Sequence, residues 1–164
     1  MIHLVEIYPN LFIGTVEDYE AVKDNLDFFT VIAAKEPYHR QAIGYTGRAC
    51  SKDHPEYLYA ERERCLICNL VDVDNPDWVS PVIIDKAIAD IDKALLNDNV
   101  QVLVCCNQGK SRSATIGFMY MKHRGYFGKN PDFEFSEKCY RTIYAGYEPA
   151  NGMREYAKRN WNNL

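Results

Sequence analysis

The chain has 164 residues, of which 47% are hydrophobic and 26% are charged. These are the proportions of a globular protein with a sizeable core, and the length predicts one domain over residues 1–164. The net charge of −4 argues against a general nucleic-acid binder, which would be basic. Without a secretion signal or an apolar run long enough to span a membrane, we expect a cytoplasmic protein with no membrane span.

The cysteines are expected to be free thiols. There are six, and a cytoplasmic protein keeps them reduced (Cys50, Cys65, Cys68, Cys105, Cys106 and Cys139). Two of them form a C-x-x-C pair, but zinc requires about four ligands and no second pair of suitable spacing is present. We therefore expect no metal and no other cofactor.

In chain order, the predicted elements alternate between strands and helices. Two short extended segments flank the turn at Pro9-Asn10, and Thr15 can cap a helix that continues to about Lys23. Apolar runs predict strands at 28–33, 65–73 and 100–104. Ser80 and Pro81 begin a helix that ends near Leu96. Later helices are expected at 112–123, 133–144 and 151–161.

This alternation predicts an α/β domain, with a short, mainly parallel central sheet flanked by helices. Residues 35–64 show no readable pattern, and a segment of that length is usually functional or poorly ordered. Its tyrosines either line the mouth of a substrate site or form an ordinary loop surface (Tyr38, Tyr45, Tyr57 and Tyr59).

Residues 102–113 carry the chemistry, and read Val-Leu-Val-Cys-Cys-Asn-Gln-Gly-Lys-Ser-Arg-Ser. A strand delivers Cys106 into a loop, and Arg112 opens the next helix. Unpaired amides at a helix start attract anions, and the guanidinium fork matches two phosphate oxygens. We therefore expect a phosphate-binding loop made by Asn107, Gln108, Gly109, Lys110, Ser111 and Arg112. A thiolate at Cys106 would face the bound phosphoryl group and attack it.

Two other interpretations of this loop are weaker. Gly109-Lys110-Ser111 matches the end of a nucleotide-binding P-loop, but that motif needs a glycine where Val104 stands. A buried structural cysteine near a surface arginine is the other alternative. The preceding strand, the internal glycine and the following helix all argue against it.

With these residues the chain resembles the dual-specificity branch of the cysteine-dependent protein tyrosine phosphatases. The signature of that family is H-C-x-x-G-x-x-R-S/T, which Cys106, Gly109, Arg112 and Ser113 match. The resemblance covers most of the chain, through residues 7–14, 85–106 and 149–153, and is weakest over 35–64. It implies Cys106 as nucleophile, Arg112 as phosphate clamp and Ser113 as hydroxyl donor to the sulfur.

The sequence departs from the family at Cys105, where the family usually has a histidine. A disulfide between adjacent cysteines is strained, so we expect Cys105 to point into the core as a small apolar side chain.

The leaving oxygen needs a proton donor, and three aspartates precede the helix that begins near Ser80. Counting back through the matching helix puts Asp74 in register with the family's general acid. Asp72 is the second candidate, and Asp77 more simply favours the helix start.

The sequence therefore predicts a metal-independent phosphomonoester hydrolase that forms a phosphocysteine. Its expected substrate is a phosphorylated protein carrying phosphotyrosine, or also phosphoserine and phosphothreonine. The alternatives are a phosphatase for phosphoinositides or RNA 5′-phosphates, and a catalytically weak phosphate-binding module.

Overall fold

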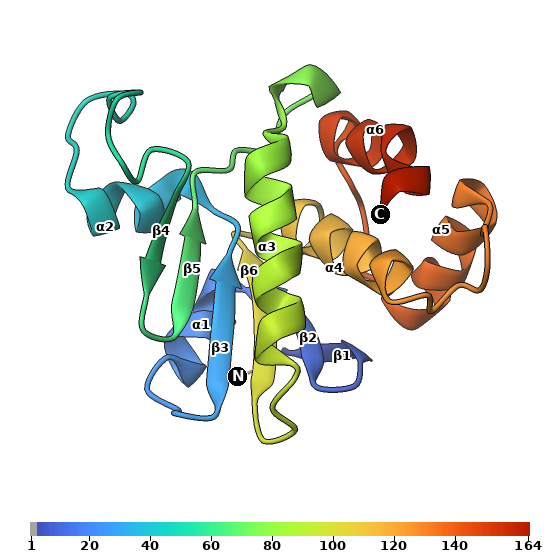
Figure 1. Cartoon of the computed structure of the whole chain (residues 1–164). Coiled ribbons are helices and arrows are strands. Elements are labelled where there is room, and N and C mark those ends of the chain that lie inside the picture. The colour runs from blue at the N-terminus through green and yellow to red at the C-terminus, as the bar shows by residue number, and fades with distance from the viewer. Residues whose placement is uncertain (1–2) are drawn as a thin grey trace.

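A six-stranded sheet forms the centre of the structure, a computed structural model that describes residues 3–164. The strand order is β1-β2-β6-β3-β5-β4, and the four inner strands are parallel (Figure 1). The strands are β1 Val5–Tyr8, β2 Leu11–Thr15, β3 Phe28–Ile32, β4 Tyr59–Arg62, β5 Cys65–Cys68 and β6 Gln101–Cys106. The predicted α/β architecture, with a mainly parallel sheet, is therefore confirmed.

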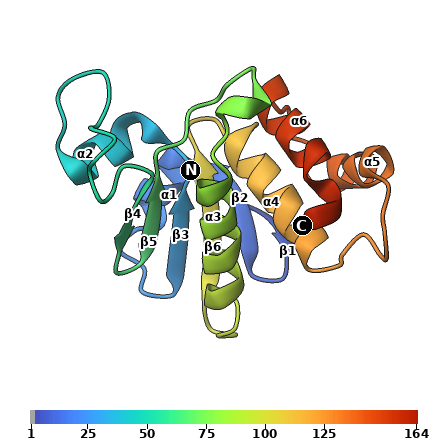
Figure 2. The ribbon, with the colours of Figure 1, turned by 45° about the horizontal axis from the view of Figure 1, so that its top comes forward.

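Helices cover both faces of this sheet (Figure 2). The helices are α1 Val16–Val22, α2 Arg40–Ile43, α3 Pro81–Ala94, α4 Arg112–His123, α5 Phe133–Ile143 and α6 Asn151–Arg159. The larger core lies on the face of α3 and α4, and the smaller core on the face of α1. β6 lies between β2 and β3, so its side chains are buried on both faces.

Local sequence explains where the helices begin. The Thr15 side chain accepts a hydrogen bond from the Asp18 amide, and the Asp18 carboxylate accepts one in return from the Thr15 amide. Ser80 accepts from the Ile83 amide, and Pro81 occupies the first helical position. Both predicted helix starts are confirmed.

The predicted strand over 65–73 is too long. β5 ends at Cys68, because the next polar groups bond outside the sheet. Asn69 donates its side-chain amide to the Tyr57 carbonyl, and the Leu70 carbonyl accepts from the Lys35 amide. The chain then leaves the sheet edge and crosses towards a short 3-10 turn at Pro76–Trp78 that precedes α3.

Residues 35–64 fold into two short helical turns, at Lys35–His39 and Arg40–Ile43, followed by a loop and the edge strand β4. Buried His39 joins the two ends of this segment. Its Nε2 lies 2.8 Å from the Glu56 carbonyl and its Nδ1 lies 3.0 Å from the Tyr45 hydroxyl.

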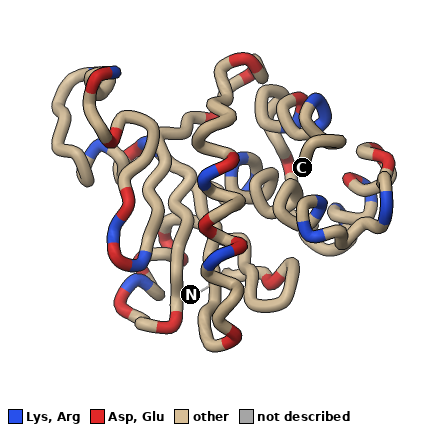
Figure 3. The backbone as a smooth tube through the Cα atoms, viewed as in Figure 1, with Lys and Arg blue, Asp and Glu red and all other residues tan. Residues whose placement is uncertain are grey.

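Acidic and basic residues are interspersed on the helices and on the β4–β5 hairpin (Figure 3). Within residues 3–164, no helix is both long and apolar enough to cross a membrane.

Candidate active site

The loop between β6 and α4 begins at Cys106, at the carboxyl end of the central strand. Side chains alternate along a strand, so the two adjacent cysteines face opposite cores. Cys106 belongs to the larger core and Cys105 to the smaller one. Burial raises the pKa of the Cys105 thiol well above its ordinary value. The expectation that Cys105 is a core side chain is confirmed, and all six cysteines are free.

The buried Cys106 sulfur lies 3.1 Å from the hydroxyl oxygen of Ser113, in the first turn of α4. A thiolate can only accept a hydrogen bond, so the hydroxyl is the donor whenever the cysteine is ionised. The structure thus brings together the two residues that the sequence pairs.

A left-handed residue shapes the loop. Gly109 has φ of +70°, and a Cβ there would lie 3.1 Å from the Gly14 carbonyl oxygen. The Tyr144 hydroxyl donates to the Gly109 carbonyl over 2.6 Å. Burial raises the pKa of Tyr144 to about 12, so this hydroxyl keeps its proton at neutral pH.

The loop amides are available for an anion. None of the backbone N–H groups of residues 107–111 donates a hydrogen bond to any residue within 3–164. Successive unpaired amides before a helix are the donors that a tetrahedral oxyanion requires.

Arg112 is fixed on one side and unpaired on the other. Its Nη1 donates to the Leu70 carbonyl over 3.0 Å, and its Nη2 donates to the Asn107 side-chain oxygen over 2.7 Å. The Nε is buried and has no partner among the described residues. This remaining donor suits a phosphate oxygen.

A cavity of about 400 Å³ lies over Cys106. Its other lining residues are all polar (Asp72, Asn107, Gln108, Lys110, Ser111, Arg112 and Glu148). Cys106 itself is only 2% exposed, so a reacting group must enter this cavity to reach the sulfur.

The structure places the three candidate acids in different surroundings. Asp72 lines the cavity, and its carboxylate accepts a hydrogen bond from the Ser111 hydroxyl over 2.8 Å. Asp74 is exposed and does not line the cavity, although the Asn151 side chain holds its carbonyl. Asp77 forms an ion pair with Arg159. In this geometry Asp72, and not Asp74, forms a hydrogen bond with the phosphate loop.

The tyrosines of the 35–64 segment do not line this cavity. Tyr38 donates to Glu20, Tyr45 lies against His39, and Tyr57 and Tyr59 line a separate groove. These tyrosines therefore form no part of the cavity lining over Cys106.

Several supporting residues could not be identified from sequence. Gly14 and Leu70 approach Gly109 and Arg112 with their backbone carbonyls, and Tyr144 contacts the loop with its hydroxyl. The three residues lie far apart along the chain. Of the three, only Gly14 was indicated by the sequence, because it ends the family-like segment over residues 7–14.

No protein-family model matches the sequence. Solved structures do match its fold. The human tyrosine phosphatase-like serine/threonine/tyrosine-interacting protein is 17% identical, with 98% of this chain and 96% of that chain covered and a TM-score of 0.62. Human DUSP28 is 19% identical, with 98% and 94% covered and a TM-score of 0.63.

A third match is Tk-PTP in its active form, at 13% identity, with 98% and 97% covered and a TM-score of 0.62. The expected resemblance is thus confirmed over nearly the whole length of each chain. This protein has the fold of the dual-specificity branch of the cysteine-dependent protein tyrosine phosphatases.

Proposed function

We propose that this protein is a phosphomonoester hydrolase that works through a phosphocysteine at Cys106. The observation that carries the proposal is the 3.1 Å contact between the Cys106 sulfur and the Ser113 hydroxyl, beneath a loop of amides without acceptors. A structural cysteine would need neither the hydroxyl nor the unpaired Nε of Arg112.

In the first step, the Cys106 thiolate attacks phosphorus. The S–P bond forms while the bond from phosphorus to the leaving oxygen breaks, and a carboxylic acid protonates that oxygen. The loop amides and Arg112 stabilise the phosphoryl oxygens.

In the second step, water attacks the phosphocysteine. The same carboxylate, now ionised, takes a proton from the water, and the S–P bond breaks. Ser113 donates a hydrogen bond to the departing sulfur, which stabilises the returning thiolate.

We propose Asp74 as the proton donor, with Asp72 as the alternative. The Asp72 carboxylate already accepts a hydrogen bond from the Ser111 hydroxyl. The Ser111 oxygen in turn accepts one from the Ala150 amide, so Ser111 links Asp72 and the loop to the start of α6. The Asp74 carboxylate has no hydrogen-bond partner within residues 3–164, and its backbone is held by Asn151. Asp72 stays the alternative because it lines the cavity over Cys106.

The proposed substrate is a phosphorylated protein, as in the phosphatases that share the fold. The polar lining of the cavity and the absence of the 35–64 tyrosines from it favour phosphoserine or phosphothreonine as well as phosphotyrosine. A substrate panel should also contain phosphoinositides and 5′-phosphorylated RNA, because the cavity lining is equally compatible with a polar leaving group.

A phosphate-binding module without turnover is the second candidate. One structural match is described as tyrosine phosphatase-like and as an interacting protein, and Cys105 replaces the histidine that usually precedes the nucleophile.

The test is hydrolysis of p-nitrophenyl phosphate with EDTA and reductant. Wild type should turn over, and Cys106→Ser should lose activity by about a thousandfold or more. Cys105→Ala is the matched control, because that thiol faces the other core, and it should remain active. If wild type folds and binds vanadate but hydrolyses no member of the substrate panel, the proposal of a phosphatase is wrong and that of a phosphate-binding module takes its place.

The acid is identified by comparing Asp74→Asn and Asp72→Asn on two substrates. Phenolate leaves less readily than nitrophenolate, so the true acid variant should lose more activity on phenyl phosphate than on p-nitrophenyl phosphate. A larger leaving-group dependence in Asp72→Asn would assign the role to Asp72.

A further inference from the structure

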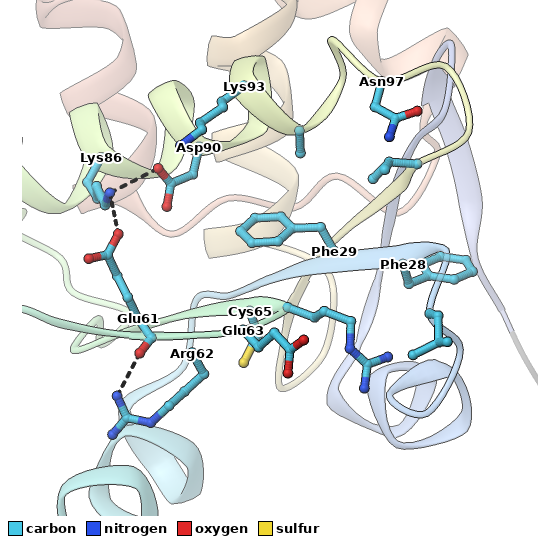
Figure 4. A pocket seen from close by; sticks show the side chains of 14 residues that line it. Phe28, Phe29, Glu61, Arg62, Glu63, Cys65, Lys86, Asp90, Lys93 and Asn97 are labelled. Carbon is cyan, nitrogen blue, oxygen red and sulfur yellow. Dashed lines mark hydrogen bonds and ion pairs between the residues drawn. The ribbon is translucent and has the colours of Figure 1, made fainter.

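The phosphate loop is distinguished by donors that face no acceptor. In a second cavity, of about 430 Å³ at the end of the sheet where β6 begins, the Lys86 ammonium is already paired with both Glu61 and Asp90 (Figure 4). In the phosphate loop, the amides of residues 107–111 donate to no residue within 3–164. Bonds other than their own must therefore hold these amides in place.

Two peptide units of the loop are held through their carbonyl oxygens. The Tyr144 hydroxyl donates to the Gly109 carbonyl over 2.6 Å, and the Glu148 amide donates to the Lys110 carbonyl over 2.8 Å. In a trans peptide the C=O and the following N–H point in opposite directions, and the single cis peptide among the described residues lies outside the loop. A bond that fixes the Gly109 carbonyl therefore also fixes the Lys110 N–H, and the Glu148 bond fixes the Ser111 N–H in the same way.

The Tyr144 bond turns the Lys110 amide towards the cavity over Cys106. Tyr144 is buried and does not line that cavity, so the Gly109 carbonyl faces the protein interior. Lys110 does line the cavity, and its N–H points away from the interior, to the side from which an oxyanion enters. In the reversed orientation, a carbonyl oxygen would face the oxyanion and repel it.

The peptide unit needs such a bond because a glycine begins it. Gly109 has φ of +70° and no side chain that restricts rotation about its backbone. The donor, in contrast, is well fixed. The Tyr147 amide donates to the Tyr144 carbonyl over 3.3 Å, and the Tyr147 hydroxyl donates to buried Glu137 over 2.8 Å.

We propose that Tyr144 is a positioning residue, whose hydroxyl holds the Lys110 amide in the direction that binds a phosphoryl oxygen. The inference rests on the proposed function, because it concerns how the same loop binds its anion. It adds a residue from the α5–α6 connection that touches neither the substrate nor the reacting atoms.

The test is the Tyr144→Phe variant, titrated with inorganic phosphate while the backbone amide signals are followed by NMR. In wild type, phosphate should shift the Lys110 and Ser111 amides downfield, because both donate to charged oxygens. Tyr144→Phe should lose most of the Lys110 shift and keep the Ser111 shift, which depends on the Glu148 amide. Its Kd for phosphate should rise about tenfold.

Tyr140→Phe is the matched control. The Tyr140 hydroxyl is also buried and donates to a backbone carbonyl, that of Ala114 in α4, over 2.7 Å. This variant loses a bond of the same kind without changing the loop, so both loop amides should respond as in wild type. A chain with 3-fluorotyrosine at position 144 keeps the ring and the donor, tests the site even if Tyr144→Phe fails to fold, and should bind phosphate at least as tightly as wild type.

Three results would overturn the role of Tyr144. They are an unchanged Lys110 shift in Tyr144→Phe, an equal loss of that shift in Tyr140→Phe, and weaker phosphate binding with 3-fluorotyrosine. If phosphate shifts no loop amide in wild type, the phosphate site itself is wrong, and the proposed function falls together with this inference. None of these readouts depends on turnover.

Discussion

Asn107 joins the phosphate loop to a segment that sequence alone could not place. Its side-chain oxygen accepts from Arg112, and its side-chain nitrogen donates to the Glu36 carbonyl over 3.1 Å. One amide thus fixes the outer face of the guanidinium and leaves Nε for the ligand. This assigns Asn107 a positioning role.

Replacing Asn107 with leucine removes both hydrogen bonds at similar volume. We expect the vanadate Kd and the KM for p-nitrophenyl phosphate to rise about tenfold, with a smaller fall in kcat, because the clamp loses orientation rather than chemistry. Gln108→Leu should change both constants less, since the Gln108 side chain makes no hydrogen bond within residues 3–164. Equal effects from the two variants would contradict the positioning role.

Single residues were predictable from sequence where the chemistry is local. Cys106, Gly109, Arg112 and Ser113 lie in one short stretch of chain, from the loop into the first turn of α4, so spacing alone relates them. The position of Asp72 over the loop was not predictable, because it depends on where β5 ends and how the chain crosses to α3.

Among the elements, α6 fixes the connection that carries the candidate acids. The Gly152 amide donates to the Val73 carbonyl over 2.9 Å, and a Cβ on Gly152 would lie only 2.1 Å from that carbonyl oxygen. Only glycine allows this approach, which places Asp72 and Asp74 on either side of an anchored residue.

Gly152→Ala must therefore displace the connection or the helix. We expect a loss of about 1–3 kcal/mol in the free energy of unfolding, measured by urea denaturation, together with reduced activity on phenyl phosphate. Gly47→Ala is the matched control, since nothing lies within 4 Å of its added Cβ, and it should stay near wild type. If Gly152→Ala were as stable as wild type, the contact between residue 152 and the Val73 carbonyl could relax without loss of stability.

The 35–64 segment is held by a histidine that burial keeps neutral. Burial lowers the pKa of His39 below its ordinary value of about 6.5, and its Nε2–H donates to the Glu56 carbonyl. Because the folded pKa is the lower one, the unfolded chain binds the proton first as the pH falls. The free energy of unfolding should therefore decrease below about pH 6.5.

His39→Gln has no such proton to bind. Urea denaturation at about pH 7.5 and about pH 5.5 should show a smaller loss of stability in this variant than in wild type. Glu36 and Glu56, whose pKa values are lowered chiefly by hydrogen bonds from Arg40 and Arg62, contribute in the same direction in both proteins. An identical pH dependence in the two proteins would show that protonation of His39 does not contribute to the loss of stability.

At the scale of the whole molecule, the sheet explains why one strand carries the site. β6 lies between two parallel neighbours with a core on each face, so its end is rigid and its two cysteines are separated. Apolar runs and helix caps made this architecture predictable. The 35–64 segment was not predictable from sequence. The side chains of Lys35, His39 and Arg40 hold it together through hydrogen bonds to backbone carbonyls further along the chain, and such bonds leave no periodic pattern in the sequence.

The central claim is a covalent phosphoryl group on Cys106, and trapping it is the most direct measurement. Ser113→Ala should slow the second step, because the departing thiolate loses its hydrogen bond, so the intermediate should accumulate. Rapid quenching and peptide mass spectrometry should then find one phosphoryl group on Cys106, and none in Cys106→Ser. Turnover without phosphate on Cys106, or activity surviving in Cys106→Ser, would contradict the account.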